Sequence, residues 1–350
     1  MITNPTPQRA LRGHLPQRIA PRAAATAEHH AHLAPRLQPR DRWLARMLFE
    51  HKVFTSHQIA QLAWPSIRAA NLRLLQLYRW RVIDRFQPFV TLGSAPMHYV
   101  LDIAGATALA HEDGLDLKDL DYRHDREIGR AYSLRLAHTT GTNGVFTALI
   151  ARARHAEASG HLTAWWSETR CAHHFGDVVR PDAYGRWHEH DREIDWFLEF
   201  DFGTENLRTL ATKLTGYERL AATTSIITPI LVWLPTARRE TGARGALATA
   251  LRALDRPHLV PLATTSSDLL DPAQALDPTA ARWLPIGAPR DPGRLRLIDL
   301  ARSWPDVSPP STGSALSAPS SRTPTTTAAP TGLLPPSPMP PDQPSYQLRR

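Results

Sequence analysis

The stretch that decides the fold of this chain is residues 179–217, VRPDAYGRWHEHDREIDWFLEFDFGTENLRTLATKLTGY. Asp182 follows a proline, and a polar segment over 184–195 has the composition of a turn. The apolar run 196–200 that comes next is typical of a buried strand. The residues after it, about 206–222, have the periodicity of a helix. We therefore predict a turn, a central strand and a helix in this order.

Three acidic side chains and a lysine of this stretch form a candidate catalytic site, with Asp182, Glu199 and Asp201 as metal ligands and Lys213 as a positive charge. Side chains two residues apart on a strand share a face, so Glu199 and Asp201 are expected to lie together. Carboxylate oxygens are the ligands that Mg²⁺ prefers. A bound Mg²⁺ or Mn²⁺ would activate water and stabilise a phosphate under attack. The pattern indicates a metal-dependent phosphodiesterase.

The order of these residues resembles the PD-(D/E)xK nuclease superfamily, and PDA, LEFDFGTE and KLTGY together resemble the replication-relaxation family of actinobacterial plasmids and mobile elements. By this resemblance Asp182 corresponds to the first acid and Glu199 to the second. Asp201 stands where the superfamily motif usually has its lysine, and Lys213 on the following helix is then expected to supply that charge. The resemblance covers about residues 41–265 and implies a role in plasmid replication and DNA relaxation. It also implies double-stranded DNA and a relaxase or other plasmid-transfer protein as partners.

Four further residues are candidates for supporting roles, namely His138, Arg180, Glu205 and Tyr217. Arg180 and Tyr217 would orient the carboxylates or contact phosphate, and core packing is the alternative for both. Glu205 would either bind metal or stabilise the first turn of its helix, where carboxylates are favoured. The family resemblance includes a histidine like His138 before a helix that we predict over 142–159. Most lone histidines are structural, which is the alternative for His138.

Upstream of this region, the sequence predicts three helices and two strands, over 41–48, 57–63, 66–80, 82–86 and 97–103, with Asp41 as the cap of the first helix. This order is typical of a winged helix-turn-helix, whose third helix enters the major groove of DNA. The candidates for DNA contact are Arg68, Asn71, Arg73 and Arg79. A winged helix that contacts proteins instead is the alternative.

Downstream, strands and helices alternate, with strands expected over 162–167, 226–234 and 258–263, a helix over 243–254, and an edge hairpin over 283–286 and 295–299. We expect an α/β (α+β) protein whose second domain is a restriction-endonuclease-like mixed sheet flanked by helices. The predicted parts are a disordered basic tail over 1–40, the winged helix-turn-helix over 41–115, the nuclease-like domain over 130–300, and a disordered Pro/Ser/Thr-rich tail over 303–350.

Composition and charge restrict the function classes. The 350 residues carry a net charge of +8, of which residues 1–40 contribute +5 from six arginines against Glu28. Positive charge at this end favours contacts with phosphate, and an arginine-rich overall composition is the alternative. The single cysteine, Cys171, excludes a disulfide framework and a cysteine-based zinc site. No apolar run approaches the roughly 20 residues that cross a bilayer, and no signal peptide is evident. We expect a cytoplasmic protein without a membrane segment.

Three functions are consistent with these patterns. The first is a DNA-binding accessory of plasmid or mobile-element replication and relaxation, with a nuclease-like domain. The second is an active Mg²⁺-dependent endonuclease that its winged helix directs to DNA. The third is a winged-helix transcriptional regulator, which would leave the acidic cluster without a purpose. Whether the chain is an enzyme, and its oligomeric state, stay open at the level of the sequence.

Overall fold

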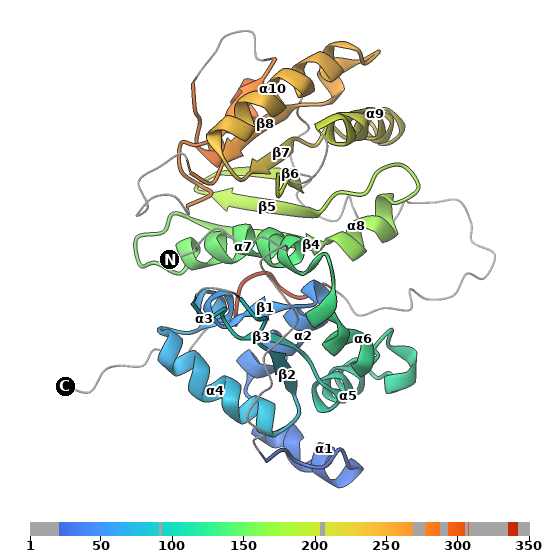
Figure 1. Ribbon diagram of the computed structural model, residues 1–350, viewed down its shortest axis with the longest axis vertical. Coiled ribbons are helices and arrows are strands. Elements are labelled where there is room, and N and C mark those ends of the chain that lie inside the picture. Colours follow the sequence, from blue (N-terminus) through green and yellow to red (C-terminus); the bar gives the residue numbers. More distant parts are fainter. Residues whose placement is uncertain are drawn as a thin grey trace. The chain divides into compact units, whose positions relative to one another are not determined.

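The computed structural model describes residues 21–90, 93–203, 207–268, 277–287, 293–304, 307 and 335–341. The chain forms two compact units that divide between Ala151 and Arg152, and residues 335–341 belong to the first of them. The first unit contains a three-stranded sheet and the second a six-stranded sheet, both accompanied by helices (Figure 1). The mixed α/β class that the sequence predicts is confirmed. None of the helices in the described part is long and apolar enough to span a bilayer.

The first unit contains most of the helices of the described residues. In chain order its elements are α1 (Ala27–Leu33), η2 (Ala34–Arg36), α2 (Pro39–His51), β1 (Phe54–Thr55), α3 (Ser56–Ala63), α4 (Ile67–Arg79), β2 (Ile83–Phe86), β3 (His98–Leu101), α5 (Ile103–Glu112), η3 (Leu117–Asp119), α6 (His124–Gly129), η4 (Arg130–Tyr132) and α7 (Leu136–Ala153). Elements labelled η are 3₁₀ helices.

Local capping explains where α3 and α4 begin. The Thr55 side chain accepts a hydrogen bond from the Gln58 backbone N–H, and the Gln58 side chain accepts one from Thr55 N–H, which makes a capping box. Ser66 accepts from the Ala69 backbone N–H in the same way at α4. The predicted helices over 57–63 and 66–80 are confirmed. The prediction that Asp41 caps the first helix is wrong, because Asp41 lies inside α2, whose N-cap is Gln38.

The three-stranded sheet has the antiparallel order β1-β3-β2. Its strands match those predicted over 82–86 and 97–103, and β1 is a short addition that the sequence pattern did not predict. Helix α5 lies close against β2 at Gly105, where an added Cβ atom would come within 2.3 Å of the Val82 carbonyl oxygen. The absence of a side chain at Gly105 therefore permits this contact.

Both ends of the chain contain ordered residues in segments that the sequence predicts to be disordered tails. Leu33 and Leu37 are buried, at 2% and 6% exposure, so apolar contacts hold this part of the predicted N-terminal tail against the first unit. At the other end, the Trp43 indole Nε1 donates to the Ser337 carbonyl at 2.7 Å. The disordered-tail expectation is thus corrected for residues 21–40 and 335–341.

The second unit alternates strands and helices. Its elements are β4 (Gly160–Ser167), α8 (Glu168–Phe175), β5 (Ala183–Glu189), β6 (Arg192–Phe200), α9 (Leu207–Thr224), β7 (Ile230–Leu234), α10 (Ala237–Arg252), η5 (Pro257–Leu259), β8 (Leu262–Ser266), β9 (Leu284–Ile286) and η6 (Leu297–Ser303). Strand order follows chain order, β4-β5-β6-β7-β8-β9. Strands β4, β5 and β6 are antiparallel, whereas β6, β7 and β8 are parallel and are connected by α9 and α10.

The two faces of this sheet carry different side chains. Phe175 of α8 and Tyr217 of α9 each have a ring centroid 5.4 Å from that of Phe197, so both helices cover the same face of β6. Strand alternation places Trp187 and Trp196, both buried, on the opposite face. The face under α8 and α9 is also the one that carries Glu199, because it lies two residues from Phe197.

Some predicted boundaries are wrong. The segment 184–195, predicted as a turn, forms most of the β5–β6 hairpin, and only its tip at His190 has a positive φ, +56°. Its charged residues suggest a loop, yet they alternate with buried residues such as Trp187.

Helix α7 begins at Leu136, before the predicted 142, and ends at Ala153, which leaves Ala156 exposed. Residues 297–303 form η6, and only Leu295 pairs with Trp283 in the expected edge hairpin.

Candidate functional site

The exposed face of α4 carries three of the four residues proposed to contact DNA. Arg68, Asn71 and Arg79 are exposed, and Leu72 between them is 68% exposed. The opposite side of the helix is buried through Leu74 and three other residues, Ala70, Leu77 and Tyr78. Residues three and four apart lie on one helix face, so Arg68, Asn71 and Leu72 form one surface that continues towards Arg79.

The fourth residue, Arg73, is engaged inside the first unit. Its Nε donates to Asp41 Oδ1 at 2.9 Å, and its Nη2 pairs with Asp41 Oδ2. Asp41 is 1% exposed, so it relies on this guanidinium for charge compensation. The Arg73 guanidinium also lies over the Trp80 ring, 5.1 Å from its centroid. Arg73 therefore joins α4 to α2, in contrast to the three exposed candidates.

In the second unit, the sheet and α9 bring Asp182, Glu199, Lys213 and Tyr217 together. Asp182 precedes β5 and accepts a hydrogen bond from the Phe200 backbone N–H at 2.8 Å. Glu199 of β6 accepts from Lys213 Nζ and from the Tyr217 hydroxyl, each at 2.5 Å. Lys213 and Tyr217 are four residues apart on α9, one helical turn, which is why both reach the same carboxylate.

The Glu199 carboxyl lies in an environment that disfavours its charge. Glu199 is 2% exposed, and burial together with the nearby negative charge of Asp182 raises the pKa of Glu199 to about 7. Lys213 and Tyr217 act in the opposite direction by hydrogen bonding to the carboxylate. Burial and the Glu199 charge also raise the pKa of the Tyr217 phenol well above its usual value. Glu199 is thus poised to exchange a proton near neutral pH.

Asp201 has separate partners. It follows the end of β6, accepts from the Gly203 backbone N–H at 2.6 Å, and pairs with Arg239 Nε of α10 at 2.8 Å. Asp201 is 4% exposed, so Arg239 compensates a buried charge. Sequence reasoning did not identify Arg239, and no local pattern could have done so because its partner is 38 residues away in the chain.

The supporting candidates are distributed differently. Tyr217 contacts Glu199, as described above. Arg180 is exposed and donates to the Gly176 carbonyl at 3.4 Å. His138 lies in α7 of the first unit, so the structure does not place it relative to the acids. Glu205 falls outside the described residues.

The hydrogen-bond donors around these acids occupy the oxygens that the expected Mg²⁺ or Mn²⁺ would bind. Both oxygens of Glu199 and both oxygens of Asp201 accept hydrogen bonds from protein N–H or O–H groups. Lys213 and Arg239 already supply two positive charges there. Among the described residues, Asp182, Glu199 and Asp201 do not form a group whose ligand atoms all lie within 4.8 Å of one another. A metal ion at Glu199 or Asp201 would therefore compete with Lys213 and Arg239 for the carboxylate oxygens, and the expected Mg²⁺ or Mn²⁺ stays a prediction.

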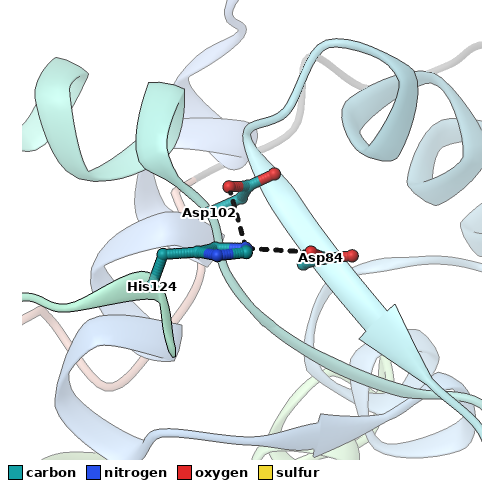
Figure 2. Close-up of side chains that lie close together, drawn as sticks. All are labelled: Asp84, Asp102 and His124. Atoms are coloured by element: carbon teal, nitrogen blue, oxygen red, sulfur yellow. Dashed lines mark hydrogen bonds and ion pairs between the residues drawn. The ribbon is translucent and has the colours of Figure 1, made fainter. Parts of the chain in front are cut away.

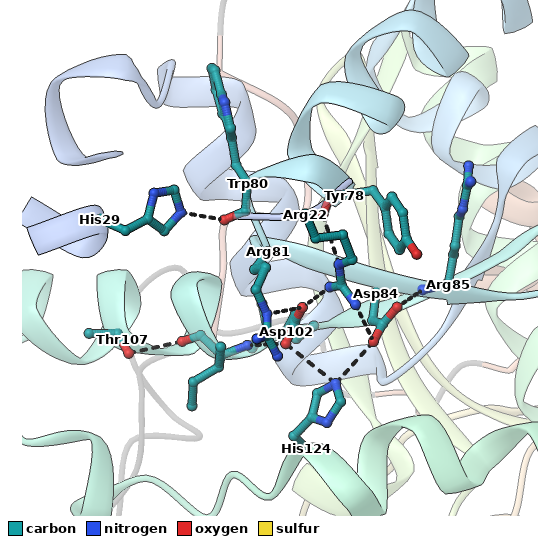
Figure 3. A network of polar contacts seen from close by, with 12 residues as sticks. Arg22, His29, Tyr78, Trp80, Arg81, Asp84, Arg85, Asp102, Thr107 and His124 are labelled. Carbon is teal, nitrogen blue, oxygen red and sulfur yellow. Dashed lines mark hydrogen bonds and ion pairs between the residues drawn. The ribbon is translucent and has the colours of Figure 1, made fainter. Parts of the chain in front are cut away.

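A group that does meet this distance criterion lies in the first unit and consists of Asp84, Asp102 and His124 (Figure 2). His124 Nε2 lies 3.0 Å from Asp84 Oδ2 and 3.4 Å from Asp102 Oδ1. Arg22 pairs with both carboxylates, and Arg81 Nε lies 3.4 Å from Asp102 Oδ2 (Figure 3). The carboxylates are therefore compensated by arginines.

The same contacts determine the titration of this cluster. Burial opposes ionisation of Asp84, but the hydrogen bond from His124 and the charge of Arg22 outweigh it and lower the pKa of Asp84. The hydrogen bond to Asp84 raises the pKa of His124. Sequence reasoning missed this cluster, although an aspartate inside the apolar run of β2 and an aspartate directly before α5 are recognisable signals.

Comparison with known proteins identifies a family for this chain. The family model described as Replication-relaxation matches residues 46–229, just over half of the chain. The matched range includes α4 and also Asp182, Glu199, Lys213 and Tyr217. No curated protein and no solved structure matches the chain. On the extent of the family match, the chain belongs to the replication-relaxation family.

Proposed function

We propose that this protein binds double-stranded DNA through the exposed face of α4 and acts as an accessory in the replication and relaxation of a plasmid or other mobile element. Its expected protein partner is a relaxase or another transfer protein of the same element. The observation that carries the proposal is the contrast along α4. Arg68, Asn71 and Arg79 are exposed, whereas Arg73 is bound to Asp41.

The order of elements around α4 supports this function. The succession α2, β1, α3, α4, β2 and β3, with an antiparallel three-stranded sheet, has the order of a winged helix. In that motif the third helix enters the major groove. Arginine makes bidentate hydrogen bonds to guanine and asparagine to adenine, so these side chains suit base contacts as well as phosphate contacts.

Duplex binding at several salt concentrations tests the proposal. The double variant Arg68→Ala/Arg79→Ala should bind more weakly, and the slope of log K against log salt should decrease by up to about 2, because two phosphate contacts are lost. The matched control is Arg238→Ala/Arg252→Ala, which removes two exposed arginines from α10 of the second unit. Equal effects of the two double variants, or no effect of the first, would exclude α4 as the contact surface.

A second candidate function is cleavage of DNA by the second unit. The observation that favours it is the contact of Lys213, on the helix after β6, with an acid that lies beside Asp182. The direct assay is incubation of supercoiled plasmid with the protein and Mg²⁺ or Mn²⁺. The accessory function predicts a plasmid that is bound and not nicked. Nicking that is lost in Lys213→Ala and Glu199→Gln, but kept in Glu193→Gln, would establish an endonuclease instead.

A transcriptional regulator would use the same face of α4. Footprinting distinguishes it from a replication accessory by the location of the protected DNA. Protection of a replication or transfer origin supports the accessory function, whereas protection confined to promoters supports the regulator.

A further inference from the structure

An apolar side chain lies in the middle of the exposed face of α4. Leu72 is 68% exposed, one helical turn after Arg68 and two turns before Arg79. Positions 68, 72, 75 and 79 follow the spacing of one helix face, and Leu75 beside Leu72 is half-buried. Single exposed leucines are common on protein surfaces, but this one lies between two exposed arginines on the surface proposed to contact DNA.

The charges around Leu72 are complementary to DNA. Helix α4 contains no acidic residue, and its arginines are Arg68, Arg73 and Arg79. Because Arg73 is paired with Asp41, the positive charge of the exposed face lies at its two ends. At about 1.5 Å per residue, Arg68 and Arg79 are roughly 16 Å apart along the helix axis, compared with a major-groove width of about 12 Å. The two arginines can therefore contact phosphates on either side of the groove while Leu72 faces the base edges.

The buried side of α4 fixes the orientation of this face. Leu74 and Leu77 are buried in the first unit, and Arg73 Nε donates to Asp41 Oδ1 at 2.9 Å. Asp41 is itself buried in α2. A contact that depends on one methyl group requires a helix that is fixed before binding, because ordering a mobile helix on DNA would cost more than the contact contributes. The pairing of Arg73 with Asp41 contributes this fixed orientation.

We propose that Leu72 contacts the 5-methyl group of thymine in the major groove and is a specificity-determining residue that makes α4 prefer A·T base pairs. The inference rests on the proposed function of α4 and adds the base that it reads. Thymine is the base that presents a methyl group in the major groove, and apolar side chains contact it there. Leu72 and this methyl group both lose water-exposed apolar surface when they meet, which favours thymine over a base without the methyl group. Asn71, the neighbouring exposed residue, suits adenine, the partner of thymine.

Replacing thymine by uracil tests the contact, because uracil keeps the charge and the hydrogen-bonding groups and lacks only the methyl group. The probe is a short duplex enriched from a random-sequence pool by the full-length wild-type protein, and its partner carries uracil in place of every thymine. The wild type should bind the uracil duplex about fourfold more weakly for the loss of one methyl contact. Leu72→Ala should bind the thymine duplex more weakly than the wild type does and should bind both duplexes equally.

Two further variants control this comparison. Leu72→Met keeps a long apolar side chain and should keep the preference for thymine. Ile67→Ala removes another exposed apolar side chain of α4, 38% exposed, that lies five residues before Leu72 and so on a different side of the helix. It should also keep the preference. Thermal unfolding of Leu72→Ala should match the wild type, because the substitution is at an exposed position.

The outcomes separate Leu72 from the rest of α4. If the wild type binds both duplexes equally, if no sequence is enriched, or if Leu72→Ala keeps the preference for thymine, the Leu72 proposal is overturned. The proposed function still stands in these cases, provided that Arg68→Ala/Arg79→Ala weakens duplex binding. If that double variant binds as the wild type does, the proposed function itself fails. Unchanged DNA binding by Leu72→Ala, together with loss of self-association or of binding to a purified relaxase, would make this face a protein contact and would also overturn the proposal.

Discussion

At the scale of single residues, the second unit shows how a buried carboxyl is held by specific partners. Glu199 has a positive group and a hydroxyl on its two oxygens, yet burial and Asp182 still raise the pKa of Glu199 to about 7. Removing one partner from a buried charge costs more than the pair contributes. Lys213→Ala is therefore expected to change the protonation of Glu199 as well as any contact with phosphate.

The raised pKa of Glu199 predicts a pH-dependent stability. Its usual pKa is 4.5, so its contribution to the free energy of unfolding is fully present below about pH 4.5 and is lost as the pH rises through about 7. Urea unfolding between pH 4.5 and 8 should show that Glu199→Gln reduces this loss, by on the order of 1–3 kcal/mol.

Two comparisons control this measurement. Asp195, whose pKa burial raises to about 6, titrates in the same window and remains in both proteins, so only the difference between wild type and variant reports on Glu199. Glu193→Gln on the same strand, where the side chain is partly exposed, should keep the wild-type profile. Parallel profiles for wild type and Glu199→Gln would show that Glu199 titrates normally.

At the scale of elements, close packing of α5 on β2 shapes the first unit. Gly105 lies where any side chain would meet the Val82 carbonyl oxygen and the Leu101 side chain. Asp102, directly before α5, caps the helix by accepting from the Ile103 N–H at 2.6 Å and also binds Arg22. The position of α5 and the ion pair of Arg22 are thus linked through one side chain.

A pair of glycine substitutions tests the packing of α5. Gly105→Ala should destabilise the first unit by roughly 1–3 kcal/mol, because the added methyl group overlaps backbone atoms that cannot move freely. Gly245→Ala, in the interior of α10 with no atom near the new Cβ, should stabilise the protein by up to about 1 kcal/mol through helix propensity. Thermal unfolding measures both changes. A stabilising Gly105→Ala would contradict the close approach of α5 and β2.

At the scale of the whole molecule, the chain returns to its first unit after completing the second. Residues 335–341 belong to the unit formed by the N-terminal half, and Ser337 accepts a hydrogen bond from the buried Trp43. The stability of the first unit therefore depends on residues near the other end of the sequence.

Truncation measures this dependence. A chain that ends at residue 334 should lose on the order of 1 kcal/mol of stability in the first unit, because the Trp43 indole loses its acceptor. A chain that ends at residue 341 keeps Ser337 and should unfold like the full-length protein. Trp43→Phe should destabilise the first unit by at least as much, since it removes the N–H donor together with part of the buried ring. Identical unfolding temperatures for the two truncated chains would exclude a stabilising role for residues 335–341.

The sequence by itself determined the class of the elements with strong local signals, because capping residues and apolar periodicity act over a few neighbouring residues. Thr55 and Ser66 mark the starts of α3 and α4, and the run 196–200 marks the centre of β6. The contact of Lys213 and Tyr217 with Glu199 is also local in the sequence, since α9 directly follows β6.

Only the tertiary structure decided which charges pair across long separations. Arg22 lies 62 residues from Asp84 and 80 from Asp102, and Arg239 lies 38 residues from Asp201. No local pattern encodes such pairs, because they depend on how whole elements pack. The same reason applies to Arg73. Its position on the helix alone predicts exposure to DNA, but the packing of α4 on α2 places its guanidinium beside Asp41.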